Sequence, residues 1–181
     1  MPTDTDPTQR YSPLAQLLHW LIAIIIIATF ALALSFDSFP RATRLWWINL
    51  HTTTGLVLFA LILLRLFWRI GRKPPPLPEG TSEFVRKSST AMHHILYLLM
   101  IVIPIIGIIA YVWHARVFDF GFFKLDFGIA NNKAVYDPME QVHKNLAFLL
   151  IGLVVLHALA ALWHQFIKRD GLLWRMWPGK G

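Results

Sequence analysis

The sequence predicts an all-α integral membrane protein, a four-helix bundle with both termini in the cytoplasm, built as a single domain over residues 1–181. Hydrophobic residues make up 56% of the chain and charged residues only 15%, which is more apolar than soluble domains are. Apolar stretches long enough to cross a bilayer occur four times, and most basic residues lie on one side of them. These observations place the chain in a membrane.

A membrane-spanning helix needs about 20 mostly apolar residues. The stretches that meet this requirement cover residues 14–34, 46–67, 92–113 and 143–167. The first is too long for a signal peptide and follows an acidic, proline-bearing segment, so we expect it to be retained as a helix. Pro104 lies inside the third stretch and should kink it, which a membrane bundle tolerates.

The basic residues predict the orientation, because cytoplasmic loops of membrane proteins carry an excess of Lys and Arg. The N-terminal segment, the proline-rich connector around KPPPLPEG and the C-terminal segment hold most of the 17 Lys and Arg residues. We therefore expect these three segments in the cytoplasm. Trp174 and Trp177, with Arg175 and Lys180, should anchor the C-terminal segment at the interface. The aromatic-rich segment 114–141 should fold over the outer face of the bundle.

The composition excludes several kinds of chemistry. The chain has no cysteine, so disulfides, thiolate zinc sites, iron–sulfur clusters and cysteine nucleophiles are ruled out. The net charge of +7 does not indicate a nucleic-acid partner, because the basic residues flank apolar segments. Acidic residues are confined to tails, loops and span ends, which argues against a proton or metal transporter. The clustered histidine motifs of membrane di-iron enzymes are missing too.

Histidines within apolar stretches are the main candidate functional residues, because a polar side chain in hydrocarbon needs a partner or a function. His143 and His157 are 14 residues apart, which on a helix is about 21 Å along the axis and within about 40° of one face. His51, near the outer end of the second span, is level with His143. His19, at the cytoplasmic end of the first span, has a depth comparable to His157 or His164. The sequence therefore offers two histidine pairs, one near each membrane face.

Two neutral imidazoles that face each other across a helix bundle ligate a b-type haem without covalent attachment. The absence of a C-x-x-C-H motif agrees with noncovalent haem. Gly55 and Gly152 lie near these histidines in the sequence and would let a porphyrin approach the backbone. For any single histidine, a hydrogen bond across the bundle is the alternative role.

The other polar residues of the spans receive lesser roles. His93 and His94, at the cytoplasmic start of the third span, are expected at the interface or beside a haem propionate, and His114 is expected in solvent. Arg65 and Arg69 are expected to reach the interface as anchors, with a haem propionate or an anionic quinone as the alternative contact.

The motifs around these residues are LLHWLIA, NLHTTTGLVLFALILLRLFWR, HHILYLLMIVIPIIG and VHKNLAFLLIGLVVLHALAALWHQF. In this order, and over nearly the whole chain, they resemble the bacterial cytochrome b561 family, whose characterised members include a membrane superoxide oxidase. The resemblance implies a multi-pass protein of the bacterial cytoplasmic (inner) membrane, surrounded by lipid, that holds two noncovalent b haems.

The resemblance also implies a role for each histidine. His19 and His157 would ligate the haem iron on the cytoplasmic side, and His51 and His143 the iron on the outer side. His164 would contact a quinone or carry its proton, and His93 matches a family histidine. The implied activity is electron transfer from the periplasmic face to ubiquinone, with superoxide oxidised to oxygen. One alternative is an electron-transfer subunit for a dehydrogenase or hydrogenase partner, with a periplasmic electron donor. The other is a haem-free membrane anchor bundle.

Overall fold

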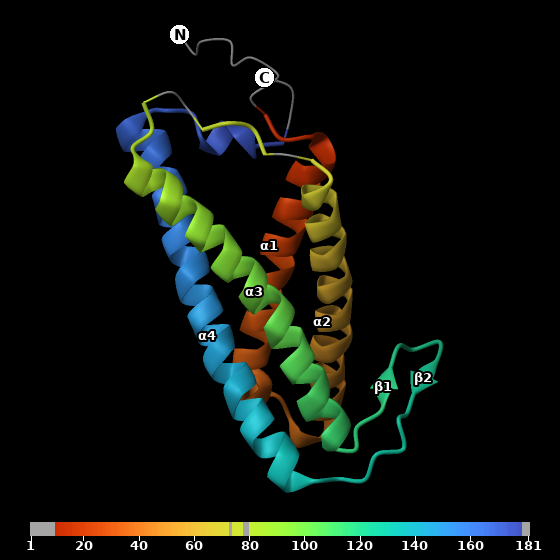
Figure 1. Cartoon of the computed structure of the whole chain (residues 1–181). Coiled ribbons are helices and arrows are strands. Elements are labelled where there is room, and N and C mark those ends of the chain that lie inside the picture. Colours follow the sequence, from red (N-terminus) through yellow and green to blue (C-terminus); the bar gives the residue numbers. More distant parts are fainter. Residues whose placement is uncertain (1–9, 73, 78–79, 179–181) are drawn as a thin grey trace.

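The computed structural model describes residues 10–72, 74–77 and 80–178. Most of them belong to four long helices, α1 (Pro13–Leu34), α2 (Arg41–Ile70), α3 (Glu83–Trp113) and α4 (Lys133–Trp163). Figure 1 shows these helices side by side along the length of the molecule. The predicted all-α architecture is confirmed.

Within the described residues, these four helices are long and apolar enough to cross a membrane, the last one continuing to Lys168. Each predicted span lies inside one of them. Polar side chains cap the starts of α1 and α3: Ser12 Oγ accepts a hydrogen bond from the amide of Ala15 (3.4 Å) and Ser82 Oγ one from the amide of Val85 (3.4 Å). Pro104 lies inside α3 without ending it. Many large apolar side chains remain exposed on the outside of the bundle, as a surface that faces lipid requires.

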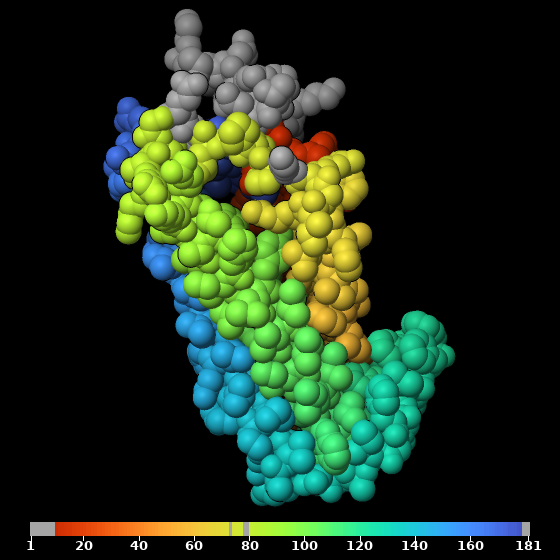
Figure 2. Space-filling view, in the orientation of Figure 1, coloured from red at the N-terminus to blue at the C-terminus, as the bar shows by residue number. Residues whose placement is uncertain are grey.

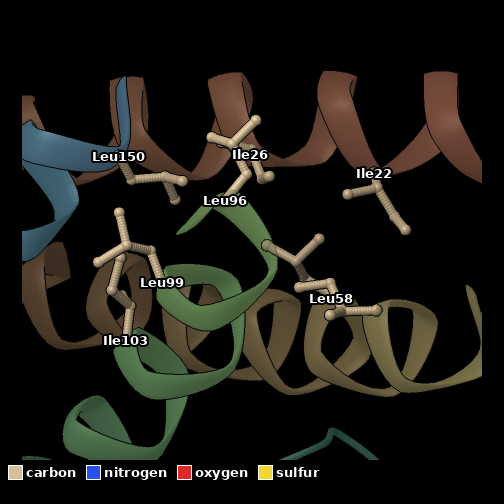
Figure 3. Packing of buried hydrophobic residues seen from close by; sticks show 8 residues of the cluster. Ile22, Ile26, Leu58, Leu96, Leu99, Ile103 and Leu150 are labelled. Atoms are coloured by element: carbon tan, nitrogen blue, oxygen red, sulfur yellow. The ribbon is translucent and has the colours of Figure 1, made fainter. Parts of the chain in front are cut away.

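A narrow apolar core joins the helices. Its members recur at helical spacing, as Ile22 and Ile26 do on α1, so each helix presents one face to its neighbours. The other members of the core are Leu58, Ile62, Leu96, Leu99, Ile103 and Leu150. Figure 3 shows these side chains gathered between the ribbons. Because Leu150 lies midway between His143 and His157 on α4, the core separates the two histidine levels.

Arg65 connects three helices near the end of the bundle where α2 stops. Its Nε donates to the hydroxyl of Tyr97 on α3 (3.0 Å), and its Nη1 donates to the carbonyl of Ala15 on α1 (2.7 Å). On the next turn, Trp68 Nε1 donates to the hydroxyl of Ser12 (3.2 Å). The sequence indicated an interfacial anchor at Arg65, or a contact with a haem propionate or quinone, whereas the structure shows a cross-link between helices.

The two terminal segments meet at this same end. The amide of Tyr11 donates to the carbonyl of Arg175 (3.2 Å), and the indole of Trp20 donates to the carbonyl of Met176 (2.8 Å). Beyond α4 the chain forms a short π-helix, η3 (His164–Lys168), and a 3₁₀ turn, η4 (Leu173–Arg175). The two ends of the described chain are thus on one side, while their assignment to the cytoplasm stays a prediction.

The predicted C-terminal anchor stays a prediction, and its residues differ in how far they are exposed. Trp174 and Trp177 are 48% and 45% exposed, but Arg175 is 8% exposed and donates from Nη1 to the carbonyl of Pro76 in the connector. Arg175 is therefore buried against the connector, and a backbone carbonyl accepts a hydrogen bond from its guanidinium. Lys180 lies outside the described residues.

At the opposite end, the segment between α3 and α4 forms a hairpin of two short antiparallel strands, β1 (Phe118–Asp119) and β2 (Lys124–Leu125). Figure 1 shows it projecting beside α2, so it covers less of the outer face than the sequence suggested. Asn49 of α2 holds its base: Nδ2 donates to the carbonyl of Asp119 (2.6 Å) and Oδ1 accepts from the Asp119 amide (3.1 Å). The turn that joins α1 to α2 contains η2 (Phe36–Ser38) and lies at this end too.

Candidate functional site

Two pairs of histidine rings face each other inside the bundle. His51 of α2 and His143 of α4 have ring centroids 6.2 Å apart with their planes at 76°. His19 of α1 and His157 of α4 have centroids 6.3 Å apart with their planes at 79°. The structure therefore brings together the His51–His143 pair that depth predicted and, of the two partners that depth left open for His19, it brings His157.

The separation within each pair suits a shared metal ion. Two imidazole nitrogens that bind one ion from opposite sides, each at about 2 Å, place the ring centroids about 6 Å apart once the ring radii are added. Both pairs match this value, and their rings come from different helices. Imidazole is also the axial ligand typical of b-type haem. The donor set of the described residues therefore fits a haem at each level.

We name His51 and His143 the outer pair, and His19 and His157 the inner pair, after their predicted sides of the membrane. The outer pair has its ring nitrogens arranged for ligation. Nδ1 of His51 lies 3.1 Å from the carbonyl oxygen of Thr29, and Nδ1 of His143 lies 2.9 Å from that of Ile103. Because a carbonyl oxygen only accepts, each Nδ1 must donate its hydrogen, and Nε2 keeps a free lone pair. Metal-binding histidines are commonly held in this way by a backbone acceptor.

Glycines leave room around the rings. An added Cβ would meet nothing within 4 Å at Gly55, one turn beyond His51, so this glycine borders open space that a flat ring system could occupy. Gly152 also has nothing within 4 Å, but it is exposed and lies about 180° around α4 from His143, so its open space is not on the face of that histidine. Gly107 of α3 plays a different part, since a Cβ there would come within 2.8 Å of His143 Cε1 and 2.9 Å of His143 Nδ1. The sequence reasoning missed Gly107. The sequence feature that could have indicated this residue is its position one turn beyond Ile103 and Pro104 in the same span.

A third ring lies beside the inner pair. His93 of α3 has its centroid 5.4 Å from that of His157, and its Nδ1 donates to the carbonyl of Ser89 (2.7 Å). His157 therefore has two imidazole neighbours, His19 and His93. The centroid separation of His19 and His157 differs from that of the outer pair by 0.1 Å. The centroid separation of His93 and His157 is shorter than both. This comparison favours His19 as the partner and leaves His93 beside it.

His164 does not join either pair. Its Nδ1 lies 2.5 Å from Oδ2 of Asp170, and the amide of Asp170 donates to the His164 carbonyl (3.3 Å). The π-helix η3 begins at His164, and π-helical turns are frequent at functional sites. Asp170, which the sequence reasoning did not single out, thus forms a compact pair with His164 at the end of α4. Of the depth-matched candidates for His19, the structure selects His157.

The remaining histidines lie away from the pairs. His94 is exposed on α3, about three turns after the helix begins at Glu83. His114 was expected in solvent, but it is partly buried and stacks on Tyr136 with ring centroids 4.2 Å apart, because the start of α4 packs against the end of α3.

Comparison with known proteins identifies the family. Residues 10–179 match the family model of prokaryotic cytochrome b561. The chain is 33% identical over 177 residues to cytochrome b561 homolog 2 of Escherichia coli (strain K12), a match that covers 95% of this chain and 93% of that protein. It is 29% identical over 174 residues to the probable superoxide oxidase CybB of Yersinia pestis, covering 95% of this chain and 98% of that one. Cytochrome b562 of Cereibacter sphaeroides is 25% identical over 172 residues, covering 92% and 94%. The chain therefore belongs to the prokaryotic cytochrome b561 family, whose members bind haem b and transfer electrons in the membrane.

Proposed function

We propose that this protein oxidises superoxide at the outer face of the cytoplasmic membrane and reduces ubiquinone near the cytoplasmic face. His51 and His143 would hold one haem b and His19 and His157 a second. The observation that carries the proposal is the matched separation of the two pairs, 6.2 and 6.3 Å, at opposite ends of one helix. Bound haem supplies reversible one-electron redox chemistry at each level.

The overall reaction balances with these two substrates. Two superoxide ions give two oxygen molecules and two electrons, and one ubiquinone takes up those electrons with two protons to become ubiquinol. The choice of superoxide as donor is supported by the similarity to the probable superoxide oxidase CybB of Yersinia pestis.

The protein's own residues have separate tasks in this scheme. The backbone carbonyls of Thr29 and Ile103 fix the tautomer of the outer rings, and the apolar core excludes water between the levels. His164 would contact the quinone or deliver its proton, with Asp170 holding Nδ1. A histidine oriented by a carboxylate is a common proton carrier. His164 lies about 10 Å along the helix axis from His157, so it is nearer to the inner pair than to the outer pair.

The outer surface offers superoxide only modest attraction. Several of its cations are paired with carboxylates: Arg44 with Asp37 at 3.6 Å, and Lys124 with Asp119 at 3.2 Å. Paired charges cancel at a distance, and salt screens the remainder. Capture of superoxide would therefore rely on access to the outer haem more than on steering.

A second candidate function is electron transfer for a dehydrogenase or hydrogenase partner. The outer hairpin favours it, because Phe122, Phe123 and Phe127 are 86%, 48% and 53% exposed. An exposed aromatic patch of this kind suits contact with a periplasmic protein.

The test uses purified full-length protein in liposomes. A reduced-minus-oxidised visible spectrum should show b-type bands, and their absence would support the haem-free bundle instead. A superoxide source with a short-chain ubiquinone should then yield ubiquinol, and added superoxide dismutase should abolish the reaction. Reduction of quinone only after addition of a partner protein would overturn the superoxide assignment and favour the second candidate.

A further inference from the structure

A cavity of about 300 Å³ opens at the end of the bundle where the terminal segments meet. It lies between the start of α1, the end of α2, the turn of α3 that carries Tyr97 and the proline-rich connector. Figure 2 shows the surface hollowed at this end, beneath the connector. The lining residues include four arginines, Arg10, Arg65, Arg69 and Arg72, together with the aromatic residues Trp68 and Tyr97. His164 does not line it, so the cavity is distinct from the proposed quinone contact.

The described part of the cavity wall contains no carboxylate. Each arginine instead contacts neutral groups. Arg72 lies 3.8 Å from the centre of the Trp68 ring, and Arg69 lies 5.7 Å from that of Tyr97. Arg10 donates from Nη2 to the carbonyl of Trp177 (2.7 Å), while its buried Nε has no hydrogen-bond partner among the described residues.

Four like charges around one small space repel one another, and partial burial strengthens that repulsion. A bound anion would relieve it and would also satisfy donors such as Arg10 Nε. The planar guanidinium forms paired hydrogen bonds with phosphate and carboxylate oxygens, which makes arginine the preferred residue for such groups. The cavity is therefore suited to an anion that accepts several hydrogen bonds.

The position of the cavity indicates where that anion comes from. It lies at the ends of membrane-spanning helices, and large apolar side chains on the same turns face outward: Leu17 is 61% exposed, Leu64 49% and Phe67 69%. Its volume is at the lower limit for small-molecule sites, enough for a headgroup but not for acyl chains. Basic pockets between helices on the cytoplasmic side bind anionic lipid headgroups. We propose that this cavity binds the phosphate headgroup of an anionic phospholipid whose acyl chains lie along α1 and α2.

Native mass spectrometry of the haem-loaded full-length protein tests the proposal. Phosphatidylglycerol and phosphatidylcholine with identical acyl chains are compared on the wild type and on Arg69→Gln/Arg72→Gln. The variant leaves Arg65 unchanged because that side chain joins three helices. The wild type should bind phosphatidylglycerol in preference, and the variant should lose affinity about ten-fold or more, given the contribution of each basic residue near a membrane.

The matched control is Arg86→Gln/Lys87→Gln, which removes two positive charges at the start of α3 outside the cavity wall. It should change the affinity less than about two-fold if general surface charge is unimportant. Arg69→Lys/Arg72→Lys keeps the charge and should keep much of the binding. If the glutamine variant loses its haem spectrum, the single variant Arg72→Gln against wild type supplies the same comparison.

Three outcomes would overturn the proposal. Equal binding of the two lipids, or an effect of the control as large as that of the cavity variant, would show that no headgroup site exists. If inorganic phosphate at the same concentration as the lipid displaced it, the ligand of the cavity would be a free anion. Displacement of the lipid by a short-chain ubiquinone would make the cavity a quinone site.

Discussion

The ring of His143 occupies the space in which a side chain on Gly107 would lie, since a Cβ at Gly107 would come within 2.8 Å of His143 Cε1. We expect Gly107→Ala to displace the ring and to weaken the outer haem, although alanine normally stabilises a helix by about 1 kcal/mol relative to glycine. The measurement is haem content per chain. Gly71→Ala is the control, because its added methyl meets only backbone atoms at 3.8 Å or more. Full haem content in Gly107→Ala would show that the ring can move aside.

The inner pair yields a prediction that separates His19 from His93. If His19 and His157 share one iron, either change to alanine should remove about half of the haem and leave the outer site intact. His93→Ala should retain both haems. Quantitative haem analysis and low-temperature spectra distinguish the two levels. Loss of half the haem in His93→Ala, with none in His19→Ala, would reverse the assignment.

The contact of 2.5 Å between His164 and Asp170 predicts a shared role in quinone reduction. Asp170→Asn and His164→Ala should each keep both haems and lower quinone turnover, by about ten-fold or more if proton delivery is lost. The double variant should be little worse than either single one, because residues that act as a unit are not additive. The measurement is ubiquinol formation at several pH values. Additive losses would indicate two independent structural effects.

We expect protonation of Asp119, at the base of the outer hairpin, to destabilise that loop at acid pH. Hydrogen bonding from the Gly121 amide, and then from Lys124, lowers the pKa of Asp119 below its ordinary 3.8. The stabilising contribution is therefore fully present above pH 3.8 and is lost as the pH falls through the lower folded value. Hydrogen exchange of the hairpin amides should rise only in that acid range. Asp119→Asn should remove the transition, and an unchanged profile in that variant would exclude Asp119 as its cause.

The paired charges on the outer face predict a weak salt effect. The rate of superoxide consumption should fall less than about three-fold between low and physiological ionic strength, because steering by a strong cationic field would produce a much steeper decline. Stopped-flow measurements over a salt series would check this. Asp37→Asn frees Arg44 from its ion pair and should make the rate more sensitive to salt. A steep decline in the wild type would contradict the prediction.

Helix geometry explains what could be predicted without coordinates. The thickness of the bilayer sets the length of each span, and a rise of about 1.5 Å per residue sets the depth of every histidine along it. His51 and His143 were therefore assigned to one level, and His157 to the other, from residue numbers alone. The absence of cysteine excluded thiolate chemistry, and the motifs around these histidines resemble those of a haem-binding family.

Depth does not determine which faces of two helices meet, because helix rotation and crossing depend on contacts between residues far apart in the chain. Depth left His157 and His164 open as partners of His19, and the tertiary structure agrees with the family resemblance in placing His157 beside it. Only the tertiary structure placed His93 beside the same His157 ring. The fit of His143 against Gly107 likewise needs α3 and α4 at their actual separation.

The amino-acid sequence by itself determined the class of the protein, its spans and the levels of its candidate ligands, since these follow from local hydrophobicity and a fixed helical rise. The tertiary structure decided the partners of each ligand, the cross-link made by Arg65 and the arginine-lined cavity. The physical reason is that side-chain packing and hydrogen bonding act between helices, and their outcome depends on the whole bundle at once.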